Sequence, residues 1–376
     1  MQRIRKILIV GGGIAGLSAA IAARQAGVEV DLVEADPAWA TVGVGLTLQP
    51  SALRAVKQLG VLDQVLACGF GYDGTCTVDA QGRVSSEVAE GPRLAGPQYP
   101  SAAGAPRPAL AAILKARAAE LGAAARAGVT VAGLGLGPSR TDVRFSDGGR
   151  GQYDLVVGAD GIYSSVRRMV FDFTLAPEFT GQGVWRFTIA RLPQVERAWL
   201  CRGGPHSAGL IPLTHDLMYL FLVENGVEDG RRIPREALAP ALAGLLSGFR
   251  GVFGELAAQL GPDSDVVYRP FEWVIAPAPW HRKRVLLIGD AAHASTAHLG
   301  AGGGMAIEDA IVLADELARA ATPEAAFRAY RDRRFERCAL TVRMSRAICD
   351  AQLGKGPPVD QASLTGRLFE LMSSPL

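Results

Sequence analysis

The chain has 376 residues, 49% of them hydrophobic and 20% charged, which is long and apolar enough to bury a large core. Its formal net charge is +2 and it has no run of lysines or arginines and no uncharged apolar run of membrane-spanning length, so we expect neither nucleic acid nor a membrane as a partner. The five cysteines are odd in number and include no CxxC pair, which argues against a disulfide framework or a zinc cluster and favours free thiols in a cytoplasmic protein without a metal.

The first predicted element is a buried strand at residues 7–10, followed by a glycine-rich turn. Gly11, Gly13 and Gly16 fit the pattern GxGxxG, and helical spacing follows over residues 17–25. Gly11 allows the tight turn, Gly13 lets the backbone approach a pyrophosphate, and Gly16 lets helix and strand pack closely. The free N–H groups at the start of such a helix bind phosphate.

A second strand is predicted at residues 28–33, and it ends at Glu34. An acidic side chain in this position accepts hydrogen bonds from ribose hydroxyls and repels a 2′-phosphate. The stretch from the first strand to Glu34 therefore predicts a site for FAD or NAD rather than for NADP.

Two later stretches repeat the order of strand, glycine–aspartate turn and helix. In the first, a strand at residues 155–157 precedes Asp160 and a helix that begins near residue 164. In the second, a strand at residues 285–288 precedes Asp290, and a glycine-rich loop then leads into a helix from Met305. Either stretch alone is equally typical of a structural corner.

Strand patterns fill the segments between these motifs. Residues 72–88 predict a hairpin with its turn at residues 80–82, and alternating apolar residues predict strands within 183–192 and 207–225. Residues 133–140 resemble a second dinucleotide loop only briefly, because Pro138 stands at the third glycine and no pattern of a strand that ends in an acid follows. Residues 346–376 are predicted to be helical, with an interruption at residues 354–358.

The three motifs in this order resemble the single-component FAD-dependent aromatic monooxygenases, which have the p-hydroxybenzoate hydroxylase fold. The resemblance covers the chain from Lys6 to about Arg346. It implies an α/β fold with a Rossmann-like FAD-binding domain, an interleaved and mostly antiparallel substrate-binding sheet, and C-terminal helices. The implied division is 1–75, 103–175 and 270–345 for the FAD-binding domain, 76–102 and 176–269 for the substrate domain, and 346–376 for the C-terminal helical segment.

The resemblance also implies which residues bind FAD. They are Gly11, Gly13, Ala15 and Gly16 at the pyrophosphate, Glu34 at the adenosine ribose, Arg107 at the phosphate–ribityl region, Asp160 for FAD and the nicotinamide cofactor, Asp290 at the ribityl chain, and Gly303, Gly304 and Met305 at the flavin pyrimidine edge. A helix that starts near Met305 would point its positive end at the negative charge of reduced flavin. The chain departs from the family at Ala297, where a proline is usual, and at Ala301 and Gly304, where Gln and Asn are common.

The implied reaction uses NADH or NADPH as a transient co-substrate and O2 to hydroxylate a small aromatic or heteroaromatic ring through a flavin carbon-4a hydroperoxide. No second nucleotide-binding module is present, so the nicotinamide is expected to visit, reduce the flavin and leave. The choice between NADH and NADPH stays open, as does the choice between a monomer and a homodimer.

Candidates for the remaining roles are fewer and weaker. We consider His298, His206 and Tyr219 for proton transfer, and Thr47, Arg186 and Trp185 for substrate binding. The competing interpretation is a hydrogen bond to backbone for His298, core packing for Tyr219 and a surface ion pair for Arg186. His293 is expected to be structural.

Two other classes of function remain as alternatives. One is an FAD-dependent oxidoreductase or cyclase that inserts no oxygen, and the other is a non-catalytic FAD-binding sensor. A flavin-dependent halogenase is disfavoured because that class carries a Trp-x-Trp pair, whereas the five tryptophans here are never two residues apart.

Overall fold

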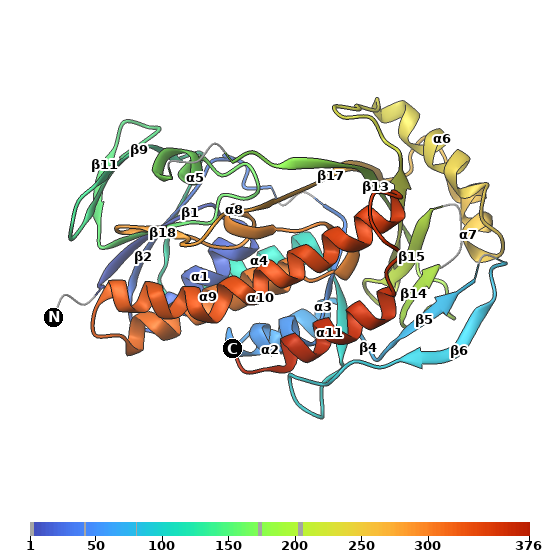
Figure 1. Cartoon of the computed structure of the whole chain (residues 1–376), viewed down its shortest axis with the longest axis horizontal. Coiled ribbons are helices and arrows are strands. Elements are labelled where there is room, and N and C mark those ends of the chain that lie inside the picture. Colours follow the sequence, from blue (N-terminus) through green and yellow to red (C-terminus); the bar gives the residue numbers. More distant parts are fainter. Residues whose placement is uncertain (1–3, 41–42, 80, 172–174, 202–205) are drawn as a thin grey trace.

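The computed structural model describes residues 4–40, 43–79, 81–171, 175–201 and 206–376 (Figure 1). Its first large sheet is mostly parallel, and the central strands of this sheet are short and apolar. In spatial order the strands of the sheet are β18 (His281–Arg282), β19 (Val285–Leu287), β12 (Leu155–Gly158), β1 (Lys6–Val10), β2 (Glu29–Glu34) and β8 (Ala124–Ala127). All residues of β12 and β19 are buried, as expected for strands that are covered by other elements on both faces.

Helices cover this sheet. Helices α1 (Ile14–Gln25) and α5 (Ser165–Val170) contact its strands, and α4 (Arg107–Glu120) and α9 (Gly302–Arg319) pack against α1. Helix α1 connects β1 to β2 and approaches β1 closely, because a Cβ at Gly16 would lie 1.9 Å from the carbonyl oxygen of Gly11. Only glycine fits there, as the sequence pattern predicts.

The second large sheet has seven strands and is antiparallel except between β14 and β5. Its order is β17 (Val266–Ile275), β13 (Glu178–Ala190), β16 (Leu217–Asn225), β15 (Ser207–Pro212), β14 (Ala198–Cys201), β5 (Thr75–Val78) and β6 (Val84–Ala89). Helices α6 (Arg235–Leu246) and α7 (Val252–Glu255) and the short turn η1 (Leu256–Gln259) pack on one face and bury a core of their own with it. The predicted β5–β6 hairpin is present, although Ala80 in its turn lies outside the described residues.

The remaining described strands form two three-stranded sheets. One consists of β3 (Gly45–Leu48), β7 (Ala102–Pro106) and β4 (Phe70–Tyr72), and the other of β11 (Arg150–Tyr153), β10 (Thr141–Phe145) and β9 (Val131–Leu136). The first joins the two large sheets, because a Cβ at Gly104 of β7 would lie 1.8 Å from the carbonyl oxygen of Pro212 on β15. Helices α2 (Pro50–Gln58) and α3 (Leu62–Cys68) lie beside it.

The C-terminal part is helical, and the predicted interruption is confirmed. Helix α10 (Pro323–Gln352) spans 30 residues and runs from the parallel sheet to the seven-stranded sheet (Figure 1). The chain leaves the helix over residues 353–360 and ends in α11 (Gln361–Ser373), which lies against α2. Within the described part of the chain, no helix is both long and apolar enough to cross a membrane.

One helix boundary differs from the expectation. Helix α9 begins at Gly302, ahead of Met305, although glycine is a poor helix former. Tertiary packing explains this early start. A Cβ at Gly304 would lie 3.0 Å from the Cβ of Ala52 on α2, so the glycine allows α9 and α2 to pack closely.

Candidate functional site

The three glycine-containing turns meet at the carboxyl ends of β1, β12 and β19. Gly11 has φ +109°, and a Cβ there would lie 2.4 Å from the carbonyl oxygen of Ala159, in the second turn. A Cβ at Gly289 would lie 2.8 Å from the Cβ of Ala15, in the first. Segments from distant parts of the sequence therefore meet at one edge of a parallel sheet, which is where the ligand-binding crevice lies in such folds.

The first turn is shaped for a pyrophosphate. A Cβ at Gly13 would meet no atom within 4 Å, so the helix start is open on that side. The Gly12 N–H donates to Glu34 Oε2 at 2.7 Å, and the Trp39 indole N–H donates to the Gly12 carbonyl at 2.9 Å. The Lys115 ammonium lies 3.9 Å from the centre of the Trp39 ring. One carboxylate oxygen of Glu34 thus fixes the backbone of the first glycine-containing turn at Gly12.

The second turn is organised by Asp160. Its carboxylate accepts hydrogen bonds from the N–H groups of Ser165 and Val166, at 2.7 and 3.1 Å, and from the hydroxyls of Ser164 and Ser165. The carboxylate therefore stabilises the start of α5 and fixes the path of residues 160–166 beside Gly11.

Asp290 begins the short helix α8 (Asp290–His293) at the third turn. Its side chain is exposed, and the described residues offer it no hydrogen-bond donor. Although solvent reaches part of the side chain, many protein atoms surround the carboxyl group. Their presence weakens its solvation and raises its pKa above the usual value, while the charges of His293 and Arg107 oppose the rise. An accessible carboxylate in a crowded crevice, without a partner, is suited to accept ligand hydroxyls.

Arg107 lies at the first position of α4, and its side chain packs against Gly43. Its charge acts on the pKa of Asp290 and also on that of Arg186 in the seven-stranded sheet. Arg107 therefore lies between the third turn and that sheet.

The start of α9 faces the same crevice. No side chain caps this helix, and a Cβ at Gly302 would meet no atom within 4 Å. The open positions at Gly13 and Gly302 and the unpartnered Asp290 fit FAD, with its pyrophosphate at α1 and its flavin at α9. FAD bound there would supply the redox chemistry, and the helix end would favour negative charge on it.

The face of the seven-stranded sheet towards β3 carries the polar candidates. Arg186 on β13 and Tyr219 on β16 share this face, because Arg186 pairs with Phe221 and Thr188 pairs with Tyr219. Burial lowers the pKa of Arg186 and raises that of Tyr219, and Thr47 on β3 lies near enough to lower the Tyr219 pKa. No carboxylate pairs with Arg186 among the described residues.

Tyr72 belongs to this group and carries no sequence signal of its own. Burial raises the pKa of its phenol, and Thr47 opposes this rise. Its hydroxyl is buried and finds no hydrogen-bond partner in the described part of the chain. Thr47, Tyr72, Tyr219 and Arg186 therefore form a polar group under the sheet. Tyr72 begins the segment predicted as a hairpin, but in the structure it ends the three-residue strand β4, and nothing in the sequence pattern indicates its place in this group.

Trp185 and His206 lie elsewhere. Trp185 is fully buried on the opposite face from Arg186, where it packs on Tyr268 with ring centres 4.8 Å apart. Its indole N–H donates to Glu224 at 2.9 Å, and Glu224 also acts on the pKa of His206, which burial lowers. Successive side chains of a strand point to opposite faces of the sheet, so Trp185 lies on the other face from its neighbour Arg186. His206 lies near Glu224, the partner of Trp185.

His298 lies in the loop between α8 and α9, in the short turn η2 (Ala297–Leu299). Its Nδ1 is 2.9 Å from Thr296 Oγ1, and its Nε2 is 3.1 Å from Gln352 Oε1. Burial lowers its pKa to about 4, although Gln352 opposes this effect. Both ring nitrogens are engaged, and the imidazole is neutral near pH 7.

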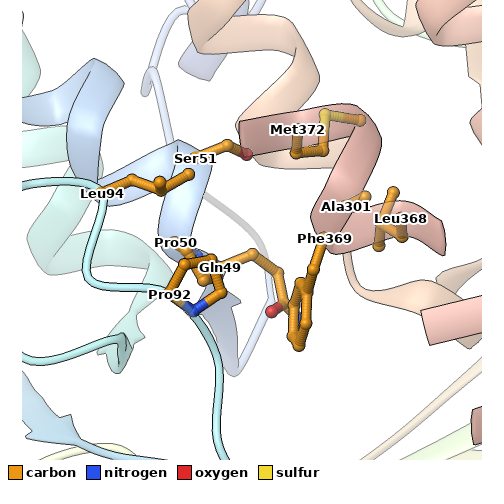
Figure 2. A pocket seen from close by; sticks show the side chains of 9 residues that line it. All are labelled: Gln49, Pro50, Ser51, Pro92, Leu94, Ala301, Leu368, Phe369 and Met372. Atoms are coloured by element: carbon orange, nitrogen blue, oxygen red, sulfur yellow. The ribbon is translucent and has the colours of Figure 1, made fainter. Parts of the chain in front are cut away.

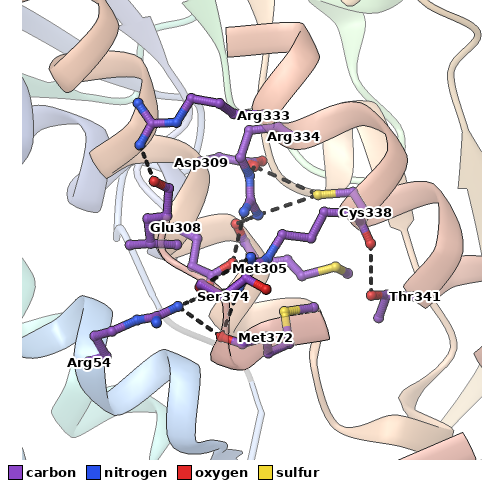
Figure 3. A network of polar contacts seen from close by, with 12 residues as sticks. Arg54, Met305, Glu308, Asp309, Arg333, Arg334, Cys338, Thr341, Met372 and Ser374 are labelled. Atoms are coloured by element: carbon purple, nitrogen blue, oxygen red, sulfur yellow. Dashed lines mark hydrogen bonds and ion pairs between the residues drawn. The ribbon is translucent and has the colours of Figure 1, made fainter. Parts of the chain in front are cut away.

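A buried ionic cluster lies behind the third turn (Figure 3). His293 Nε2 is 2.6 Å from Asp309, and the donor atoms of His293, Asp309 and Cys338 all lie within 4.8 Å of one another, as metal ligands do. Arg334 already supplies a cation there, because it donates to Asp309 at 2.7 Å and reaches Cys338 Sγ at 3.3 Å. Burial would raise the pKa of Asp309, but the charges of His293 and Arg334 outweigh it and hold the pKa at about 2. The cluster is structural, and all five cysteines are unpaired.

A narrow apolar gap opens between α2 and α11 (Figure 2). Phe369, Leu368 and Met372 line it from α11, and Ala301, directly before α9, lies at its wall. The C-terminal helix thus lies close to the residue that precedes α9.

Known proteins share both the sequence and the fold. The family model described as an FAD binding domain matches residues 5–345. The aurachin C monooxygenase/isomerase of Stigmatella aurantiaca is 31% identical, over 98% of this chain and 94% of its own. The 2-heptyl-3-hydroxy-4(1H)-quinolone synthase of Pseudomonas aeruginosa is 33% identical, over 82% and 79%. The crystal structure of Klebsiella pneumoniae HpxO with FAD and uric acid superposes with a TM-score of 0.82 at 23% identity, covering 99% of this chain and 94% of that one. The chain therefore belongs to the FAD-binding-domain family of flavin-dependent monooxygenases, with the p-hydroxybenzoate hydroxylase fold that its three motifs resemble.

Proposed function

We propose that this flavin monooxygenase uses NADH or NADPH and O2 to hydroxylate a small aromatic or heteroaromatic substrate that carries an anionic or acidic group. One observation carries the proposal. Arg186 shares a face of the sheet with Tyr219, near Thr47, and has no carboxylate partner among the described residues. An unpaired guanidinium in a partly buried site favours a carboxylate, a phenolate or an enolate as its ligand.

The names of one relative and one structure support a nitrogen heteroaromatic ring. The relative is named as the synthase of 2-heptyl-3-hydroxy-4(1H)-quinolone, and the HpxO crystal contains uric acid. A quinolone and uric acid both present ring N–H groups and carbonyl oxygens. Such a ring could accept from Arg186 and exchange hydrogen bonds with the Tyr219 and Thr47 hydroxyls.

In this proposal each residue has a defined role. Asp290, Arg107 and the turn at Gly11–Gly16 hold FAD, which supplies the redox chemistry with the nicotinamide and oxygen. Arg186 orients the ring, and the Tyr219 phenol donates a hydrogen bond, because its raised pKa keeps it protonated. We assign no substrate contact to Trp185 or His206, and no role as a base to His298.

The test combines substrate screening with a matched pair of variants. Nicotinamide oxidation and product mass are followed together for FAD-loaded protein with NADH or NADPH and a panel of phenols, aromatic acids and N-heteroaromatics. With an active substrate, Arg186→Gln is expected to raise KM about ten- to hundredfold, the loss typical of a hydrogen bond to a charged group. Arg269→Gln is the control, because it removes a nearby positive charge from an exposed position on β17. Unchanged KM in Arg186→Gln would refute the role of Arg186.

The same assay separates the two alternatives. Substrate-stimulated oxidation without an added oxygen atom and without peroxide would identify an oxidoreductase or cyclase, whereas oxidation that yields only peroxide indicates uncoupled turnover with a compound that is not the substrate. No nicotinamide oxidation with any compound, although FAD is bound, would identify a sensor. One added oxygen atom supports the monooxygenase.

A further inference from the structure

Side chains from three separate parts of the molecule meet at Gln352, the last residue of α10. Its Oε1 accepts from Gln182 Nε2 on β13 at 2.9 Å and lies 3.1 Å from His298 Nε2 in the loop between α8 and α9. Its Nε2 donates to Ser207 Oγ on β15 at 3.0 Å. One amide thus joins the substrate sheet, the loop at the FAD crevice and the long C-terminal helix.

These bonds define the state of His298. Because the amide oxygen of Gln352 can only accept, His298 Nε2 carries a hydrogen, and Nδ1 accepts from the Thr296 hydroxyl at 2.9 Å. The Phe271 ring packs edge-on at 5.4 Å between ring centres. The imidazole is therefore held from three sides in one tautomer.

The loop has few other attachments. Residues 294–301 connect α8, which begins at Asp290, with the start of α9. Within this loop Gly300 has φ +62°, a left-handed conformation that favours glycine. Gln49 donates to the Leu299 carbonyl at a long 3.4 Å, and Ala294 forms an isolated bridge to Val274. The bond from His298 to Gln352 is thus the main polar link from the middle of the loop to the rest of the described protein.

We propose that Gln352 is a positioning residue that holds the loop at residues 294–301 in register with strands β13 and β15. Through it, the C-terminal helix fixes how far the flavin side of the crevice stands from the substrate sheet. The inference uses the FAD-binding fold and is independent of the substrate class.

The first experiment replaces Gln352 with leucine in the FAD-loaded protein. Gln352→Leu keeps the volume and removes three hydrogen bonds, so amide hydrogen exchange at residues 295–300 should become about tenfold faster or more. Gln58→Leu is the control, because Gln58 is also the last residue of a helix, but its side chain is exposed. Exchange that is unchanged in the loop, or faster to the same extent throughout the chain, would overturn the proposal.

A second change tests positioning through rescue. Proline should fit at Ala297, because this residue is exposed, opens the turn η2 and follows Thr296 at ψ 153°, and its N–H makes no hydrogen bond within the described structure. Ala297→Pro stiffens the loop by another route, so in the double variant it should restore slow exchange at residues 295–300. A double variant that exchanges as fast as Gln352→Leu, although Ala297→Pro alone folds normally, contradicts the proposal.

A third variant remains informative if leucine at this position prevents folding. Gln352→Glu keeps both acceptor bonds and adds a negative charge beside His298 Nε2, which raises the pKa of the imidazole. Histidine NMR should show His298 titrating at higher pH than in the wild type, with loop exchange close to normal when His298 is charged. A His298 pKa that does not move would show that the two side chains do not pair in solution.

Discussion

His298 shows how a single side chain can be fixed in one protonation state. The imidazole is surrounded by protein, both its nitrogens are engaged, and burial lowers its pKa to about 4 from an ordinary 6.5. A histidine in this state holds structure rather than moving protons near pH 7. The protonation of His298 should therefore affect the free energy of unfolding of the protein.

The free energy of unfolding should depend on pH through His298. Above pH 6.5 the ring is neutral in both states. As the pH falls from 6.5 towards 4, the unfolded chain takes up a proton that the native state refuses, so stability falls, and this contribution ends below pH 4. Urea unfolding of wild type and His298→Gln at pH 7.5 and 5 measures this contribution. The wild type should lose more stability than the variant, and equal losses would contradict the neutral state.

At the residue scale, the sequence predicts what depends on backbone and misses what depends on packing. Gly11, Gly16 and Asp290 are predicted because a turn, a close approach or a strand end requires those residue types, and the structure has the required turns and close approaches. Tyr72 and Gln352 are not predicted, because their positions follow from the contact of segments far apart in sequence. Trp185 and Arg186 are neighbours in the chain, and only the pairing of β13 shows which of them shares a face of the sheet with Tyr219.

At the scale of elements, arginines attach α11 to the rest of the protein (Figure 3). The carbonyl groups at the end of α11 accept from Arg54 on α2 and from Arg337 on α10, each at 2.9 Å from the Met372 oxygen. Only Leu368 and Met372 of this helix are buried, so apolar packing contributes little. Cations at a helix carboxyl end also complement its dipole.

Loss of one arginine should therefore loosen α11. Arg54→Met keeps the aliphatic stem and removes bonds to the Met372 and Ser373 carbonyls, so the expected cost is about 1–3 kcal/mol of unfolding free energy. Hydrogen exchange at residues 361–373 should accelerate. Arg319→Met is the control, because Arg319 is 70% exposed and makes only an i,i+4 pair, whose loss should cost below about 0.5 kcal/mol. If both variants behave alike, the arginine attachment is unimportant.

The order of helices and strands is predictable from periodicity and glycine position, but their ends are not. Residues 300–304 read as a loop because glycine disfavours helix, whereas α9 includes three of these glycines. The contact with Ala52 that explains this early start comes from α2, which lies close to the other end of the chain. Local sequence cannot report such a contact.

At the scale of the whole molecule, the fold brings the three glycine-containing turns close together. A bound FAD would contact more than one of them at once. The residues that we expect at the cofactor follow β1 and β12 and lie at the starts of α4 and α9, so bound FAD would link segments from distant parts of the chain. A ligand that binds only the native state adds stability according to its concentration relative to Kd.

The midpoint of thermal unfolding should consequently rise with FAD. At 100 times Kd the added free energy is about 2.7 kcal/mol. Asp290→Asn removes the charge that we expect at the ribityl chain, so it should weaken FAD binding about ten- to hundredfold and show less stabilisation at the same FAD concentration. Asp229→Asn is the control, because Asp229 is exposed and far from the crevice along the chain. Equal stabilisation of the two variants would exclude Asp290 from the site.

The order of strands in the parallel sheet also has a consequence for biosynthesis. Strand β1 is made first but pairs with β12, which begins only at Leu155, and β12 in turn pairs with β19, which begins only at Val285. Until the start of α9 at Gly302 has also left the ribosome, the nascent chain lacks one wall of the crevice. We therefore expect cofactor capture to be a late event in the life of the polypeptide, and a prematurely terminated chain to be released without its flavin.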